Sequence, residues 1–346
     1  MPRDIVEPLP SEKDALVRLV KGVVLAQGNA FIKELLRSRG IKIGTTKADF
    51  ETNMMEAIHN GELQRQHIDS WLREVEGWGD QHVYLFNVSK SLRDDALWQE
   101  PKKIESKVKA AGLAKQWNSR SSLEYPPAQT LTGVYFENAA LTFVWHKGLE
   151  LWVRAKAKDY QEEIDGDTYE YRAYRMRGDR LVTRFELRPS DGLAAAFIQI
   201  AVDDEEHKRA LEIVRATINR LWSFDEFEPF PIANAIKKLD TRALENDGIT
   251  AQSTRLNSGD AYVEFGARSA LSGYQDSTPV RDVRRAVRQA SFTGMNGRFS
   301  VPLDSGNDVD RKVRIQMFGG ERRIKIASQM TADQVWGILG LIRESV

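Results

Sequence analysis

The stretch FIKELLRSRGIKIGTTKADFETNMMEAI, Phe31 to Ile58, contains two helical patterns joined by a short loop with two glycines. The first pattern has a continuous apolar face, formed by Phe31, Ile32, Leu35 and Leu36. Gly40 follows, where the end of a helix favours a residue with left-handed backbone. Thr45 or Thr46 can cap a second helix, whose apolar residues are Phe50, Met54 and Ile58. The stretch therefore predicts a helix, a tight loop and a second helix.

Helical patterns also flank this stretch on both sides. Ser11 is a suitable N-cap for a preceding helix with the apolar residues Leu16, Leu19, Val20 and Val23. A fourth helix, at about 62–76, would bury Ile68, Trp71, Leu72 and Val75. Residues 11–76 therefore predict a four-helix domain. Residues 1–10 predict an extended arm, because three of the nine residues from Pro2 to Pro10 are prolines.

The middle of the chain has the pattern of an antiparallel sheet. Its successive strand candidates are His82 to Val88, Ala139 to Trp145, Leu149 to Lys158, Tyr169 to Arg177, Arg180 to Leu187 and Phe197 to Val202. Turns are expected at Lys147-Gly148, Asp165-Gly166 and Gly178-Asp179. An amphipathic helix should start at Asp203 or Asp204. Residues 128–231 are thus predicted as an antiparallel β domain, and residues 77–127 as a linking segment with basic helices.

The last third, residues 232–346, predicts a small α/β domain. Its elements are a strand at 262–267, a helix at 280–290, a strand at 298–301, a hairpin around Gly319-Gly320, and a final helix at 331–344. The predicted fold class is α+β: an N-terminal four-helix domain, a central antiparallel sheet with flanking helices, and this C-terminal domain.

Composition narrows the classes of function. The formal net charge is zero, so any affinity for nucleic acid must come from local clusters of basic residues. The chain has no cysteine, which excludes disulfides, thiolate nucleophiles and cysteine-containing zinc sites. The first residues lack an apolar segment of signal-peptide length, and no window approaches the ~20 apolar residues that span a bilayer. We expect an intracellular protein, cytoplasmic or chromosome-associated.

Motifs for catalysis or metal binding are sparse. No two of the five histidines stand four residues apart, and the phosphate-binding and nucleophile-elbow glycine motifs are missing. Asp191 with Glu206 and Lys208 loosely imitates a magnesium-dependent nuclease. However, Glu206 falls in the first turn of a predicted helix, where a carboxylate favourably meets the helix dipole. We therefore expect no metal and no cofactor.

Basic residues cluster near the C-terminus. Arg281, Arg284, Arg285 and Arg288 fall on one face of the helix predicted at 280–290, opposite Val280, Val283 and Val287. Residues 279–326 hold eleven Lys or Arg and five Asp or Glu, and Arg322 and Arg323 of this set lie on the hairpin. In the central sheet, strand alternation would place Arg154, Lys156 and Lys158 on one face. These residues are candidate phosphate contacts, although such charge runs are also typical of solvated surfaces.

The opening stretch resembles the SAP motif, a small helix–loop–helix DNA-binding module. The likeness lies in Leu35, Leu36, Gly40, Ile41, Gly44, Thr45, Lys47 and Phe50. Asn53 stands where the family usually has arginine, and Thr46 is an additional residue. The resemblance implies that the loop contacts DNA through Lys42 and Lys47, with a phosphate at the N-terminus of the second helix.

A second resemblance covers about 230 residues. Trp71 to Lys90, WLREVEGWGDQHVYLFNVSK, followed by a sheet containing Leu149 to Arg154, is similar to centromere protein N. That family couples a helical death-fold-like domain to a curved β domain. The resemblance implies DNA recognition by shape and charge, and a C-terminal α/β segment that binds a partner protein.

Three functions are thus predicted. The first is non-catalytic, largely sequence-independent binding of duplex DNA. The second is a protein-interaction adaptor or sensor subunit of a larger complex, which in a bacterium could be a defence system. Its docking elements would be the tryptophan-rich segment Trp71 to Trp98, the acidic connector Asp225 to Glu228, or the C-terminal domain. The third is a magnesium-dependent nuclease.

Overall fold

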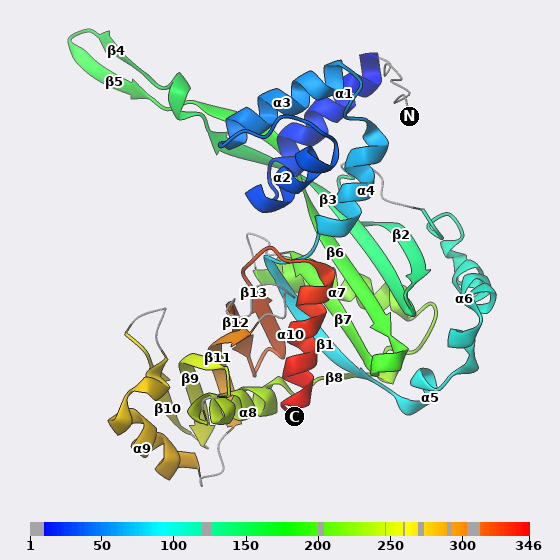
Figure 1. Ribbon diagram of the computed structural model, residues 1–346, viewed down its shortest axis with the longest axis vertical. Helices are drawn as coiled ribbons and strands as arrows, with labels where there is room; N and C mark the ends of the chain where they lie inside the picture. Colours follow the sequence, from blue (N-terminus) through cyan, green and yellow to red (C-terminus); the bar gives the residue numbers. More distant parts are fainter. Residues whose placement is uncertain are drawn as a thin grey trace. The chain divides into compact units, whose positions relative to one another are not determined.

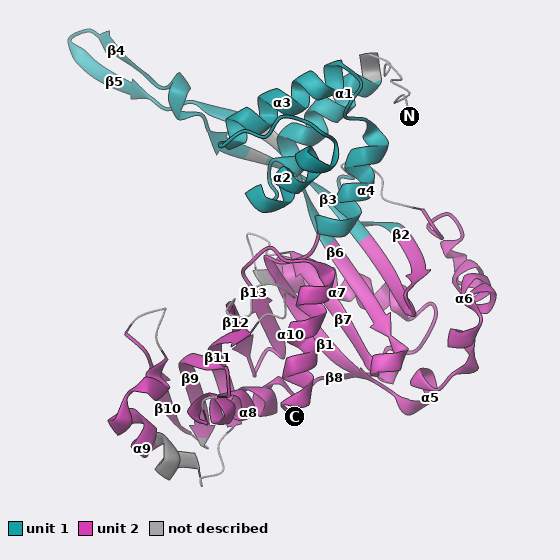
Figure 2. Cartoon of the chain, in the orientation of Figure 1, with its two compact units in different colours: residues 1–76, 120–132, 145–182 teal, residues 77–119, 133–144, 183–346 magenta. Residues whose placement is uncertain are grey.

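Helices and strands are both prominent in the computed structural model, which describes residues 10–119, 126–199, 204–245, 247–258, 260–268, 273–288, 293–302 and 312–346 (Figure 1). The chain forms two compact units (Figure 2). The first comprises residues 1–76, 120–132 and 145–182, and the second residues 77–119, 133–144 and 183–346. The predicted α+β class is confirmed. Within the described ranges, every helix is too short or too polar to cross a membrane.

The N-terminal helices form as predicted. They are α1 (Pro10–Leu19), which continues as the π-helical turn η1 (Val20–Val24), α2 (Asn29–Ser38), α3 (Lys47–His59) and α4 (Arg65–Val75). Their apolar faces share one buried cluster, which includes Leu16, Leu36, Phe50, Met54 and Ile68. Residues 1–9 of the predicted arm lie outside the described residues, and Pro10 already belongs to α1.

A buried ionic network anchors the end of α4 within the first unit. Glu76 follows α4, and its carboxylate accepts hydrogen bonds from Arg180 Nε at 2.7 Å and Arg180 Nη2 at 2.5 Å. His146 Nε2 lies 3.8 Å from the same carboxylate, and its Nδ1 lies 2.6 Å from Thr132 Oγ1. Burial raises the pKa of Glu76, but the Arg180 charge and these bonds outweigh it and lower the pKa to about 2.

Eleven strands of the described chain form one sheet, in the order β10-β9-β11-β12-β13-β1-β7-β6-β3-β2, with β8 paired to β1. Their bounds are β1 Gln81–Val88, β2 Thr130–Glu137, β3 Ala140–Arg154, β6 Tyr174–Arg188, β7 Leu193–Gln199, β8 Phe227–Pro229, β9 Thr250–Ser258, β10 Ala261–Gly266, β11 Thr293–Pro302, β12 Lys312–Phe318 and β13 Arg323–Ile326.

Strand β1 lies in the interior of this sheet. One of its edges pairs with β7, and the other pairs first with β13 and then with β8, all antiparallel. The strands on both sides of residue 231, where sequence placed a domain boundary, thus belong to the same sheet. Helices of the segment 77–127 follow β1: α5 (Lys90–Arg93), η2 (Ala96–Gln99), α6 (Pro101–Val108) and η3 (Lys109–Leu113).

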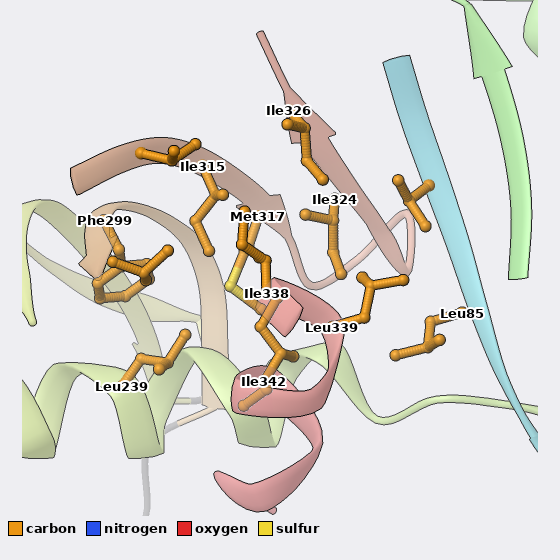
Figure 3. Close-up of a cluster of buried hydrophobic side chains, with 14 of the residues drawn as sticks. Leu85, Leu239, Phe299, Ile315, Met317, Ile324, Ile326, Ile338, Leu339 and Ile342 are labelled. Carbon is orange, nitrogen blue, oxygen red and sulfur yellow. The ribbon is translucent and has the colours of Figure 1, made fainter. Parts of the chain in front are cut away.

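Helices cover both faces of the sheet in the second unit. On one face, α8 (Ile232–Leu244) and α10 (Ala332–Glu344) bury apolar side chains against β1, β11, β12 and β13, as Figure 3 shows for Leu239, Ile338 and Leu339. On the other face, His207 of α7 (Asp204–Ile218) contacts His82 of β1, with ring centroids 4.1 Å apart. Because His82 and Val83 are adjacent in the strand, their side chains point to opposite faces.

Two predicted turns are wrong. Lys147-Gly148 lies inside the 15-residue strand β3, and Gly178-Asp179 lies inside the 15-residue strand β6. Gly148 donates its N–H to the carbonyl of Pro126 at 2.7 Å, and the strand continues beyond it to Arg154. The turn at Asp165-Gly166 is confirmed, and it joins β4 (Tyr160–Ile164) to β5 (Asp167–Tyr171).

Candidate nucleic-acid interface

Internal hydrogen bonds define the loop of the SAP-like stretch. Gly40 has the expected left-handed backbone, with φ of 67°. Thr46 caps α3 by accepting the N–H of Asp49, and Asp49 Oδ2 accepts the N–H groups of Thr45 and Thr46, both at 2.9 Å. A Cβ on Gly44 would lie 2.0 Å from the Cβ of Asp49. The second loop glycine therefore accommodates the capping carboxylate.

These contacts occupy the position that the SAP resemblance assigns to a phosphate. The backbone N–H bonds of Thr46 and Thr45, followed by their hydroxyls, lower the pKa of Asp49 to about 2, so a carboxylate faces the first turn of α3. Lys47 donates its Nζ to the carbonyls of Leu25 at 2.6 Å and Gln27 at 3.2 Å. Lys47 therefore ties α3 to the end of the first helix, and we remove it from the proposed DNA contacts. Lys42 remains exposed.

The basic strand face expected at residues 154–158 does not form. Strand β3 ends at Arg154, and the 3-10 turn η4 (Lys156–Lys158) replaces the predicted alternation. Arg154 pairs with Asp159, with Nη2 to Oδ2 at 2.7 Å, and its guanidinium lies 5.3 Å from the ring centroid of Tyr174. Lys156 and Lys158 are exposed. Of this group, these two lysines remain candidates.

The four arginines predicted to share one helix face, at positions 281, 284, 285 and 288, lie on α9 (Thr278–Arg288). Arg281 is half-buried, whereas the side chains of Arg284, Arg285 and Arg288 lie outside the described residues. The expected apolar face needs a correction, because Val283 is 55% exposed while Val280 packs against the core. At Val283, α9 therefore covers less of the core than its sequence pattern predicted.

The two hairpin arginines differ in environment. Arg322 is exposed. Arg323 is buried: its Nη1 lies 3.1 Å from His82 Nδ1 and 3.4 Å from His207 Nδ1, and its Nη2 lies 2.5 Å from a carboxylate oxygen of Glu321. Since a guanidinium only donates, both imidazole Nδ1 atoms accept. Arg323 thus stabilises the packing of α7 on β1 and is withdrawn as a DNA contact.

The basic helices predicted within residues 77–127, which were not among the predicted DNA contacts, form a basic surface on α6 and its continuation η3. Ile104 and Val108 are fully buried, and lysines occupy the remaining sides of the helix, with Lys107 half-buried beside Trp222. Lys107 Nζ lies 5.2 Å from the ring centroid of Trp222, and Arg220 Nη2 would lie 2.7 Å from a Cβ on Gly112, so the end of α7 adds a cation. We name this surface the α6 basic face; its members are Lys102, Lys103, Lys107, Lys109, Lys115 and Arg220.

Residues 100–115 contain five lysines and only two acids, Glu100 and Glu105. Lys103 pairs with Glu100 and Lys109 with Glu105, each at 2.6 Å, within the same helical segment. Such exposed pairs contribute only ~0.2–1 kcal/mol, so a phosphate can replace these partners. The sequence signal was available, because lysines alternate with Ile104 and Val108 at helical spacing.

The nuclease constellation does not assemble around a metal site. Glu206 lies on α7 and not on a strand, and Asp191 belongs to the 3-10 turn η5 (Pro189–Asp191). Among the described residues, no group of three His, Asp or Glu side chains is arranged to hold a metal ion.

Several residues of the docking elements expected for an adaptor are engaged within the fold. Trp71 and Trp78 are buried. Trp98 donates its Nε1 to the carbonyl of Leu92 and stacks on Trp222. In the acidic connector, the Glu226 carboxylate accepts hydrogen bonds from Ser89 and Ser91, and these bonds lower its pKa.

A scan against protein-family models and a search of curated proteins found no match to this chain. The resemblances to the SAP motif and to centromere protein N therefore stay predictions.

Proposed function

We propose that this chain binds duplex DNA without catalysis and with little sequence preference, through the α6 basic face. The observation that carries the proposal is the concentration of six cations in a chain whose formal net charge is zero: four on α6 and η3, Lys115 shortly after η3, and Arg220 shortly after α7. The buried Ile104 and Val108 fix the helix, so that its lysines are presented from a rigid element. Lysine ammonium groups bind phosphates as point charges, and such contacts do not distinguish one base from another.

The energetic origin of this binding is counterion release. Each phosphate that a lysine or arginine neutralises contributes about −0.9 to the slope of log affinity against log salt. With all six cations engaged, the slope approaches about −5, and affinity falls steeply between about 50 and about 200 mM salt. Exposed cations elsewhere, namely Lys42 of the SAP-like loop together with Lys156, Lys158 and Arg322, are further proposed contacts.

The test is a fluorescence-anisotropy titration of the full chain with unrelated duplexes of equal length over this salt range. The variant Lys102→Ala/Lys103→Ala/Lys109→Ala should lower affinity and reduce the slope by about 2.7, because about three phosphate contacts are lost. A matched control removes three exposed cations elsewhere, Lys238→Ala/Lys312→Ala/Arg343→Ala. Absence of binding at low salt, or equal losses in both triple variants, would contradict the proposal.

The alternative function is a protein-interaction adaptor. The observation that favours it lies outside the docking elements predicted from the sequence. Eleven large hydrophobic side chains are exposed in the described chain, and seven of them lie between residues 152 and 176. Those residues surround and include the β4–β5 hairpin.

A further inference from the structure

The β4–β5 hairpin is an arm of the first unit that extends away from helices α1–α4 (Figure 2). Within the described chain, β4 and β5 pair only with each other, and every residue of both strands is exposed. The connecting turn has positive φ at Asp165 (54°) and Gly166 (86°), which fits the two-residue turns that continue the strand twist. The arm is therefore a regular hairpin and not an irregular loop.

The two faces of the arm differ in character. The register pairs Tyr160 with Tyr171, Glu162 with Tyr169, and Ile164 with Asp167, so these six side chains share one face. Tyr160 and Tyr171 stack with ring centroids 4.7 Å apart. The remaining pairs, Gln161 with Glu170 and Glu163 with Thr168, form a polar face. All four large apolar residues of the hairpin thus lie on one uncovered face.

An isolated two-stranded hairpin is at best marginally stable in water, and stability usually requires something packed on its apolar face. The four apolar side chains are 56%, 38%, 47% and 37% exposed, in the order Tyr160, Ile164, Tyr169, Tyr171. Amphipathic tyrosines of this kind are enriched in the central part of protein interfaces. The apolar face therefore has the composition of an interaction surface.

Charge changes sign along the arm. The tip carries the acids Glu162, Glu163, Asp165 and Asp167, with no basic residue between 160 and 171. The base carries the exposed cations Lys156, Lys158, Arg172 and Arg175, of which Arg172 pairs with Glu170 at 3.5 Å. Between these charged ends lies the stacked pair of Tyr160 and Tyr171. If a second arm lay antiparallel to the first, the acidic tip of each arm would lie beside the basic base of the other.

We propose that the arms of two copies of this chain pack in opposite directions to form a symmetric dimer, with the two Tyr160–Tyr171 pairs in contact and each acidic tip beside the basic base of the other arm. The two-fold axis would pass near the Tyr160–Tyr171 pair, with two acid–base contacts flanking a tyrosine centre. A two-fold interface needs a surface complementary to itself, and the sign change along this arm supplies that property. A purely basic or purely acidic partner would match only one end of the arm.

The test uses two charge-reversed variants and their mixture. Glu162→Lys/Asp167→Lys makes the tip basic, and Lys156→Glu/Lys158→Glu makes the base acidic. Each should raise the dimer Kd at least about tenfold, because like charges then face each other. An equimolar mixture should restore association, since the reversed tip of one variant matches the reversed base of the other.

Sedimentation velocity of the full chain, from about 1 μM to about 100 μM, measures these Kd values. Glu264→Lys/Glu344→Lys, two exposed acids of the second unit, is the matched control and should dimerise like wild type. Tyr160→Ser/Tyr171→Ser should abolish the dimer independently of charge. A monomeric wild type, which would assign the face to a different molecule, overturns the proposal. Charge-reversed variants that each dimerise as tightly as wild type, or a mixture that stays dissociated, overturn it as well.

Discussion

Replacement of Glu76 by glutamine should be among the most destabilising single changes in the first unit. The Glu76 side chain is 5% exposed and that of Arg180 is 0% exposed, and two hydrogen bonds join them. Glu76→Gln keeps the shape but removes the negative charge, which leaves a buried guanidinium without its counter-charge. Breaking a buried ion pair in this way costs about 3–5 kcal/mol, a large part of the ~5–15 kcal/mol that stabilises a typical domain.

Hydrogen exchange followed by mass spectrometry is the suitable assay, because it reports the stability of each unit separately. Peptides from α1–α4 should lose protection in Glu76→Gln, whereas peptides from α8 and α10 should keep it. The double variant Glu76→Leu/Arg180→Met should recover most of the loss, since no charge is then left buried. If the free energy of opening of the α1–α4 peptides changed by less than about 1 kcal/mol, the Glu76–Arg180 pair would contribute no more than an exposed ion pair, and the reasoning would be refuted.

The pH dependence supplies an independent check on the same residue. The pKa of Glu76 falls from an ordinary value of 4.5 to about 2 on folding. Its contribution to the free energy of unfolding is therefore complete above about pH 4.5 and is lost as pH falls toward 2. The stability difference between wild type and Glu76→Gln should shrink over that interval. A constant difference would show that the carboxylate charge contributes nothing.

Two further predictions concern Lys47 and Glu206. Lys47→Ala should lower the stability of the first unit by about 1–2 kcal/mol, because it removes donors to the Leu25 and Gln27 carbonyls. The same variant should leave DNA affinity unchanged, whereas Lys42→Ala should weaken it. If an anisotropy titration showed weaker binding for Lys47→Ala and unchanged binding for Lys42→Ala, Lys47 would be a DNA contact. Wild-type protein incubated with plasmid and Mg²⁺ should give no cleavage on agarose gels. Cleavage that Glu206→Ala abolishes would show the chain to be a nuclease.

Local sequence signals predicted the helices of the first unit well. Apolar spacing and the Thr46 cap reproduce α3, and Gly40 adopts the expected left-handed backbone. The same reasoning failed at Gly148, because pairing along a long strand outweighs the turn preference of one glycine. Helix α8 was missed, although Ile232, Ile236 and Leu239 stand at helical spacing.

Candidate contacts were harder to predict than helices. The sequence shows that Lys47, Arg154 and Arg323 are cations, but it does not show their distant partners. Lys47 bonds carbonyls twenty or more positions away, and Arg323 lies beside a histidine 241 positions away. The charge pattern of the sequence therefore identified basic segments. Only the fold shows which of their cations bond within the protein and which are exposed.

The interior position of β1 has a consequence for synthesis of the chain on the ribosome. Residues 81–88 emerge long before β7, β8 and β13, the three strands that pair with them. Until residue 326 has been made, the part of the β1 edge at residues 81–83 stays open, and open edges of this kind promote aggregation. Early termination within the last β-hairpin would leave that edge permanently exposed. We expect nascent chains of the second unit to need chaperone protection until β13 is complete.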